Sequence, residues 1–169
     1  MKSLEELPKE DLLKLVTMYA KNWLAHDGCW FLAIEETHGI ETAIDLDTKA
    51  WHTFAVIEAK RIMREFDIPH NGGLKALETA MQYRLYAAIN RQEIEWVDEN
   101  TMIFKMVECR VQKARTEKNF APFPCKSVGM VEFSQFAKTI DPHIQMRCIT
   151  CPPDPIGETY CAWEFRVNG

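Results

Sequence analysis

The spacing of apolar residues changes near residue 90, and this change constrains the fold more than any other feature of the chain. Before it, apolar residues recur about three to four positions apart, which is the spacing of one helix face. After it, apolar and polar residues alternate, which is typical of half-buried strands. The sequence therefore predicts a helical part at about residues 8–90 and a sheet part at about residues 91–168.

Gly, Pro, Asn and Asp residues mark where the expected helices and strands begin and end. In the first half we predict a helix that begins after Pro8 and ends at Asp27-Gly28, a short helix from Trp30 to Thr37, a long helix from about Ile40 to Phe66, and a helix marked by Leu74 to Ile89. In the second half we predict strands at 93–97, 102–111, 144–149 and 159–167, and a helix at 128–140 capped by Ser127. This order predicts a single α+β domain over 1–169, with the helices packed on an antiparallel ββαββ sheet of about four strands.

Composition excludes several classes of protein. A formal net charge of −5 and a pI of about 5.6 argue against a nucleic-acid-binding surface, which would be basic. No run of about 20 apolar residues is present, so we expect no membrane partner. The N-terminus lacks the pattern of a secretion signal. We therefore expect a cytoplasmic protein whose cysteines are reduced thiols or metal ligands.

The six cysteines are the main candidates for chemistry. Cys148 and Cys151 form a Cys-x-x-Cys pair, and strand alternation points Cys109, Cys148 and Cys161 to the covered face of the sheet. Four thiolates make a tetrahedral zinc site. We therefore consider zinc as the cofactor, held by the following residues: Cys125, Cys148, Cys151 and Cys161. The alternatives are inert thiols packed in the core, or one reactive thiol with a lowered pKa.

A second set of residues points to a ligand pocket between helices and sheet. Glu58 interrupts the apolar stripe of the long helix, so its carboxylate is either ion-paired, with Arg61 or Arg84, or a general acid/base with a raised pKa. Trp51 and Trp163 offer large apolar surfaces for such a pocket. With Cys109, these residues form the predicted ligand pocket.

Specific motifs resemble a known family. They include Glu108-Cys109-Arg110-Val111-Gln112, Cys148-x-x-Cys151-Pro152-Pro153-Asp154 and Cys161-Ala162-Trp163-Glu164-Phe165, together with Asp27-Gly28-Cys29-Trp30-Phe31 in the helical half. The chain resembles a prokaryotic family of cytosolic proteins of unknown function. Around Cys148 and Cys161 it is also similar to aminothiazoline-carboxylate hydrolases and to 4-vinyl-reductase domains. That resemblance implies an α+β ligand-binding fold with a cysteine-containing C-terminal sheet.

Two functional hypotheses follow. The first is a small-molecule- or metal-binding domain that uses the cysteine cluster. The second is a hydrolase of a small C–N or C–S substrate that uses a cysteine nucleophile or a metal-activated water. A homodimer is compatible with both hypotheses.

Overall fold

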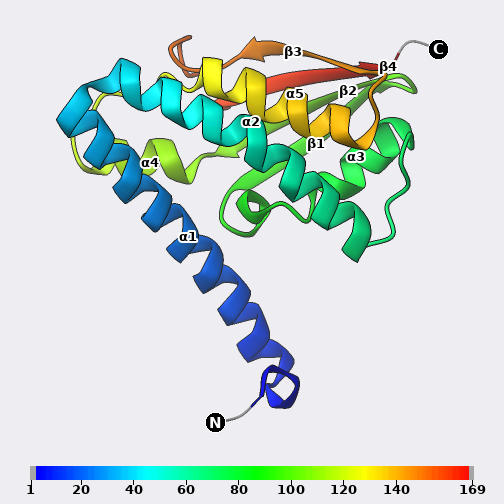
Figure 1. The fold of residues 1–169 in the computed structure, drawn as a ribbon. Coiled ribbons are helices and arrows are strands. Elements are labelled where there is room, and N and C mark those ends of the chain that lie inside the picture. The colour runs from blue at the N-terminus through cyan, green and yellow to red at the C-terminus, as the bar shows by residue number, and fades with distance from the viewer. Residues whose placement is uncertain (1–2, 168–169) are drawn as a thin grey trace.

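The computed structural model describes residues 3–167. The 3-10 helix η1 (Leu4–Glu6) is followed by α1 (Lys9–His38), α2 (Ile40–Glu65), α3 (Gly73–Met81), the 3-10 helix η2 (Leu85–Ala88), β1 (Arg91–Asp98), β2 (Thr101–Glu108), α4 (Arg110–Glu117), α5 (Lys126–Ile140), β3 (Ile144–Thr150) and β4 (Cys161–Val167). Figure 1 shows the first-half helices below a sheet built from the second half. The predicted α+β class is confirmed.

The sheet has four antiparallel strands in the order β1-β2-β4-β3. Its outer face carries ion pairs: Lys105 pairs with Glu95, and Arg147 pairs with Glu164 at 2.7 Å. Its inner face carries large apolar side chains, among them Phe104. Only one face of the sheet is therefore available for helices to cover, as is common in antiparallel sheets.

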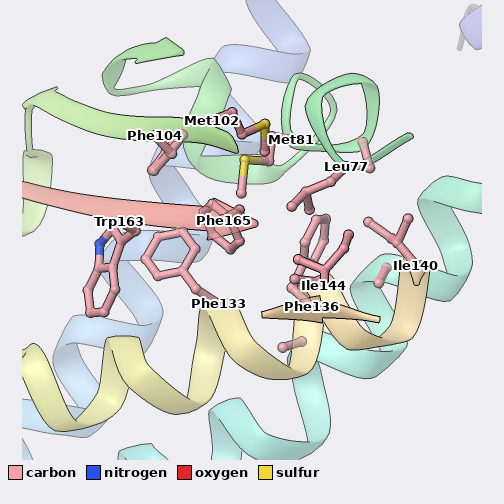
Figure 2. Packing of buried hydrophobic residues seen from close by; sticks show 14 of the residues in the cluster. Leu77, Met81, Met102, Phe104, Phe133, Phe136, Ile140, Ile144, Trp163 and Phe165 are labelled. Carbon is pink, nitrogen blue, oxygen red and sulfur yellow. The ribbon is translucent and has the colours of Figure 1, made fainter. Parts of the chain in front are cut away.

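α5 covers this inner face directly. In Figure 2, Phe133 of α5 lies against Trp163 and Phe165 of β4, and the ring centroids of Phe133 and Trp163 are 5.0 Å apart. Gly129 permits the close approach, because a Cβ at this position would lie 2.6 Å from the Trp163 ring. Trp163 and Phe165 are fully buried, so the centre of the core is the contact between α5 and β4.

The two long helices, α1 and α2, form a hairpin, and α2 is the helix that packs against α5. Gly39 joins α1 to α2 with a φ of +85°, a conformation that glycine adopts without the steric cost of a Cβ. α2 packs along α5 through small buried residues such as Ala55 and Ala59. The second half of α1 lies against this body, whereas its first half projects away from it (Figure 1).

Two helix boundaries predicted from sequence were wrong. The predicted break at Asp27-Gly28 is absent, and α1 runs unbroken to His38. A helical glycine costs only about 1 kcal/mol relative to alanine, and contacts of Trp23 and Phe31 on either side hold the helix. The predicted helix over Leu74 to Ile89 ends at Met81, because Arg84 turns inward to reach two buried carboxylates.

The second strand also differs from expectation. It ends at Glu108, so Cys109 is not a strand residue but the N-terminal cap of α4, a helix that the sequence analysis missed. Within β2 the buried apolar residues are Met102, Phe104 and Met106, the opposite phase to the one that an inward Cys109 requires. Apolar side chains on both faces of this strand conceal its phase. The helix expected at 128–140 begins at Lys126, with Cys125 rather than Ser127 at its cap.

The last two strands were predicted correctly. Ile144 and Met146 of β3 face inward, with Cys148 in the same direction, and Cys161, Trp163 and Phe165 do so in β4. Among the described residues, no helix is both long enough and apolar enough to span a membrane.

Candidate ligand-binding cleft

A cleft of about 520 Å³ lies between α1 and the rest of the body. Its walls come from α1, α2, η2, α4, α5 and the inner end of the sheet. Exposed residues such as Lys21 and Lys118 stand at its mouth, and buried Trp163, Cys151 and Cys161 lie at its floor. Most of the lining side chains between mouth and floor are apolar. The cleft therefore has an apolar interior that a molecule can enter from solvent.

Two contacts hold α1 over the cleft. The Phe31 ring packs edge-on against Phe123, with centroids 4.9 Å apart. The Arg115 guanidinium donates two hydrogen bonds to the Glu35 carboxylate, at 2.7 and 3.0 Å. The Glu35 pKa is lowered by these bonds from Arg115. A bidentate pair of this kind fixes orientation as well as distance, so α1 and α4 keep a defined separation.

The segment that leads into α5 is fixed by one buried side chain. Gln112 accepts a hydrogen bond from the Phe123 N–H at 2.9 Å and donates one to the Phe123 carbonyl at 2.8 Å. The same amide nitrogen lies 3.5 Å from the Cys125 sulfur. The Gln112 side chain thus satisfies both backbone groups of Phe123, as a neighbouring strand would. In this way it positions Cys125 at the cleft.

Aromatic rings and carboxyl groups form the α1–α2 end of the cleft. Trp51 stacks on Tyr86 with centroids 5.8 Å apart. Burial, with the nearby Asp27 and Glu132 carboxylates, raises the pKa of Asp47 to about 7. Burial also raises the pKa of Asp27 and of Glu132. With a pKa of about 7, Asp47 is only partly ionised at neutral pH, so this end of the cleft is less charged than its composition suggests.

Five of the six cysteines line the cleft: Cys29, Cys109, Cys125, Cys151 and Cys161. Burial raises the pKa of Cys109 to about 12, which keeps this thiol protonated and unreactive at neutral pH. Cys148 lies on β3 outside the lining residues, and burial raises its pKa too. The Cys-x-x-Cys pair is therefore divided between the cleft and the sheet.

The Cys125 and Cys151 thiols are in contact, with their sulfurs 3.5 Å apart. The hydrogen bond between the two thiols lowers the pKa of Cys125. The same bond, the adjacent Cys161 thiol and burial raise the pKa of Cys151. The two thiols therefore differ in acidity, and Cys125 is the more acidic of the pair.

Three of the four predicted pocket residues line the cleft, and Glu58 does not. Trp51, Trp163 and Cys109 line the cleft, although the indole Nε1 of Trp163 is buried without a hydrogen-bond partner among the described residues. Glu58 does not line the cleft. Its carboxylate accepts a hydrogen bond from the Arg84 Nε at 2.9 Å, so of the two partners considered for it the structure shows Arg84. The role of these residues in binding stays a prediction.

The predicted zinc ligands are only partly assembled. Cys125 and Cys151 are in contact and Cys161 is adjacent, but Cys148 is not part of this group. Over residues 3–167, no group of three or more His, Cys, Asp or Glu side chains has an arrangement that could hold a metal ion. Zinc therefore stays a prediction. So does the hydrolase hypothesis; the described residues lining the cleft include no histidine to act as a base for a thiol.

Sequence reasoning missed the contribution of α1 and α4 to the site. Asp27-Gly28 was interpreted as a helix break, yet both residues line the cleft, together with Cys29 of α1 and Gln112 of α4. A glycine and a carboxylate in the middle of an apolar helix were the available signal. Both residue types are unfavourable inside a helix, which suggests a role other than helix formation.

Comparison with known proteins gives a family and a distant structural likeness. The chain belongs to a family of unknown function, DUF6125, whose model matches residues 5–167. This confirms that it is a member of a family without an assigned function. No curated protein matches the sequence. In fold, it is similar to the crystal structure of a trafficking protein particle complex subunit 3 from Naegleria fowleri covalently bound to palmitic acid. The identity is 6%, the coverage 95% of this chain and 98% of that chain, and the TM-score 0.49.

Proposed function

We propose that this protein binds a small, uncharged and mainly apolar molecule in the cleft beneath α1. The observation that carries the proposal is the cleft itself, with a volume of about 520 Å³ and walls of apolar side chains. Pockets for small molecules and cofactors typically measure about 300–1,000 Å³ and are lined in this way. Its buried floor, formed in part by Trp163 and Cys161, provides the desolvated surface from which an apolar ligand gains affinity.

The polar groups of the cleft favour an uncharged ligand. Burial raises the pKa values of Asp27 and Asp47, so an anion beside these two carboxyl groups would be repelled whenever either of them ionises. Asp47, with a pKa of about 7, holds a proton in part of the molecules at neutral pH and can then donate a hydrogen bond to a carbonyl or hydroxyl oxygen. Such a bond would orient the ligand at the Tyr86 end of the cleft.

The test is titration of the protein with N-phenyl-1-naphthylamine, an uncharged dye whose fluorescence rises in apolar surroundings. We expect saturable binding of about one dye per chain. The informative variant is Gly28→Leu, because Gly28 lines the cleft and a Cβ there has no heavy atom within 4 Å. The added side chain therefore enters open space and should reduce dye affinity at least tenfold, the equivalent of roughly 1.4 kcal/mol.

The matched control is Gly28→Ala. Both substitutions raise helix propensity at the same position, but alanine adds only a methyl group to the cleft and should leave dye affinity within about twofold of wild type. Equal affinities in the leucine and alanine variants, or no saturable dye binding to the wild-type chain, would remove the proposal. Circular dichroism of both variants checks that α1 remains helical.

A further inference from the structure

The thiol pair at the floor of the cleft carries a second inference, which does not depend on any ligand. We propose that Cys125 and Cys151 are a redox-active pair that forms a reversible disulfide when the protein meets a peroxide. The two sulfurs are in contact at 3.5 Å, although the residues lie 26 positions apart in the chain. This pairing differs from the Cys148–Cys151 pairing that the sequence motif suggests.

The backbone on both sides of the pair is already fixed in position. The Lys126 N–H donates to the Pro152 carbonyl at 2.9 Å, which joins the residue after Cys125 to the residue after Cys151. The Lys126 ammonium also pairs with the Asp154 carboxylate at 2.8 Å. That carboxylate in turn accepts a hydrogen bond from the Cys151 N–H at 3.2 Å.

These bonds keep the two cysteine backbones side by side. A disulfide bond is about 2.05 Å long, so the sulfurs must approach each other by about 1.5 Å, a distance that side-chain rotation supplies.

The pair is also chemically asymmetric. Cys125 caps the N-terminus of α5, where the helix dipole favours a thiolate, and it is half-buried at the cleft wall. Cys151 is buried and therefore less accessible to a reagent. Cys125 is therefore the residue that reacts first with a reagent that enters the cleft, and Cys151 is the resolving thiol.

The reaction balances in two steps. The Cys125 thiolate attacks one oxygen of hydrogen peroxide. The O–O bond breaks, and hydroxide leaves and takes a proton to become water, so that Cys125 becomes a sulfenic acid. The Cys151 sulfur then attacks the Cys125 sulfur. The S–O bond breaks, the Cys151 thiol proton leaves with the hydroxyl group as water, and a disulfide forms. Overall, two thiols are oxidised and one peroxide is reduced to two waters.

The sequence makes the product easy to identify. Trypsin cuts after Lys118, Lys126, Arg147 and Arg166, so Cys125 lies in peptide 119–126 while Cys148, Cys151 and Cys161 share peptide 148–166. A Cys125–Cys151 disulfide joins the two peptides. A disulfide between two of Cys148, Cys151 and Cys161 remains inside one peptide, and fragmentation of the joined species distinguishes Cys151 from Cys148 and Cys161 as the partner of Cys125.

The experiment treats the reduced, metal-free full-length chain with an equimolar amount of hydrogen peroxide, blocks the remaining thiols, and maps the tryptic peptides by mass spectrometry. We expect the joined 119–126/148–166 species as the main product, and its loss on treatment with a dithiol reductant. It should form in the Cys148→Ser variant and be absent from Cys151→Ala. The oxidised chain should also unfold at a higher denaturant concentration than the reduced chain, because the bond closes a loop.

Several results would overturn the inference. These are a disulfide internal to peptide 148–166, a joined species that survives in Cys151→Ala, or stable sulfenic or sulfinic acid at Cys125 with no crosslink. Fragmentation of the joined wild-type species shows whether Cys151, rather than Cys148 or Cys161, is bonded to Cys125, so the inference remains testable if Cys151→Ala folds poorly. The Gly28→Leu variant separates this inference from the proposed ligand, since its dye binding should fall while Cys125 and Cys151 still crosslink.

Discussion

At the scale of single residues, Asp47 makes the stability of the protein depend on pH. Its pKa is 3.8 in an unfolded chain and about 7 in the fold. Between these values the folded chain holds a proton that the unfolded chain has lost, so the free energy of unfolding falls as pH rises from about 4 to about 7. The stabilisation is complete below this window and lost above it.

We predict that Asp47→Asn flattens this dependence, by up to about 1.4 kcal/mol per pH unit relative to wild type. Urea unfolding at several pH values across the window measures the change. Asp45→Asn is the control, because Asp45 is an exposed carboxylate on the same helix, paired with Lys49. Parallel pH profiles for wild type and Asp47→Asn would contradict the buried, protonated state of Asp47.

At the scale of elements, one arginine joins three of them. Arg84, at the cap of η2, donates to Glu58 of α2 at 2.9 Å and to Glu132 of α5 at 2.7 Å. The Leu85 N–H also donates to Glu58, at 3.3 Å. The two carboxylates raise the pKa of Arg84 despite its burial, so the guanidinium stays charged. This contact ends α3 early and sets where η2 packs.

We predict that Arg84→Met destabilises the fold by about 3–5 kcal/mol, because two buried carboxylates lose their only partner cation among the described residues. Denaturant unfolding gives the value. Replacing Glu58 and Glu132 by glutamine in the same variant should recover part of the loss, since the uncompensated charge is removed. The exposed Arg61→Met on α2 serves as a neutral control. If Arg84→Met resembled that control, Arg84 would not connect these elements.

At the scale of the whole molecule, the chain has a stable body and a poorly supported arm. The first half of α1 projects from the body (Figure 1), and Leu13, Val16 and Tyr19 on it are 57–59% exposed. Helices of fewer than about 12–15 residues are marginal in water without tertiary packing. The sheet and α5, in contrast, contain the fully buried core residues Phe136, Trp163 and Phe165.

Hydrogen exchange should therefore divide the molecule. We predict that amides of residues 9–19 exchange at least about a hundredfold faster than those of β4 and α5, because they open without disturbing the core. Mass spectrometry of exchanged peptides measures this at two protein concentrations. Strong protection of residues 9–19 at the lower concentration would contradict the prediction. Protection that grows with concentration would instead show that copies of the chain associate through this arm.

The parts of the fold that could be predicted are those with a clear period. α2, β3 and β4 follow from residue spacing, because each has one apolar and one polar face. β2 lacks that contrast, so its phase was wrong. α4 is short and highly polar, and nothing in its residue pattern distinguishes it from the end of a strand. Gly28 suggested a helix end that tertiary contacts of Trp23 and Phe31 override.

The sequence by itself determined the α+β class, the order of the main elements and the cysteines as the residues of chemical interest, because these depend on local spacing and residue type. Only the tertiary structure decided which thiols meet. Cys148 and Cys151 are close in sequence, but one stays on the sheet and the other reaches the cleft floor. Cys125 joins Cys151 because the Lys126–Pro152 bond brings distant segments together, and contacts between distant segments leave no mark in local sequence spacing.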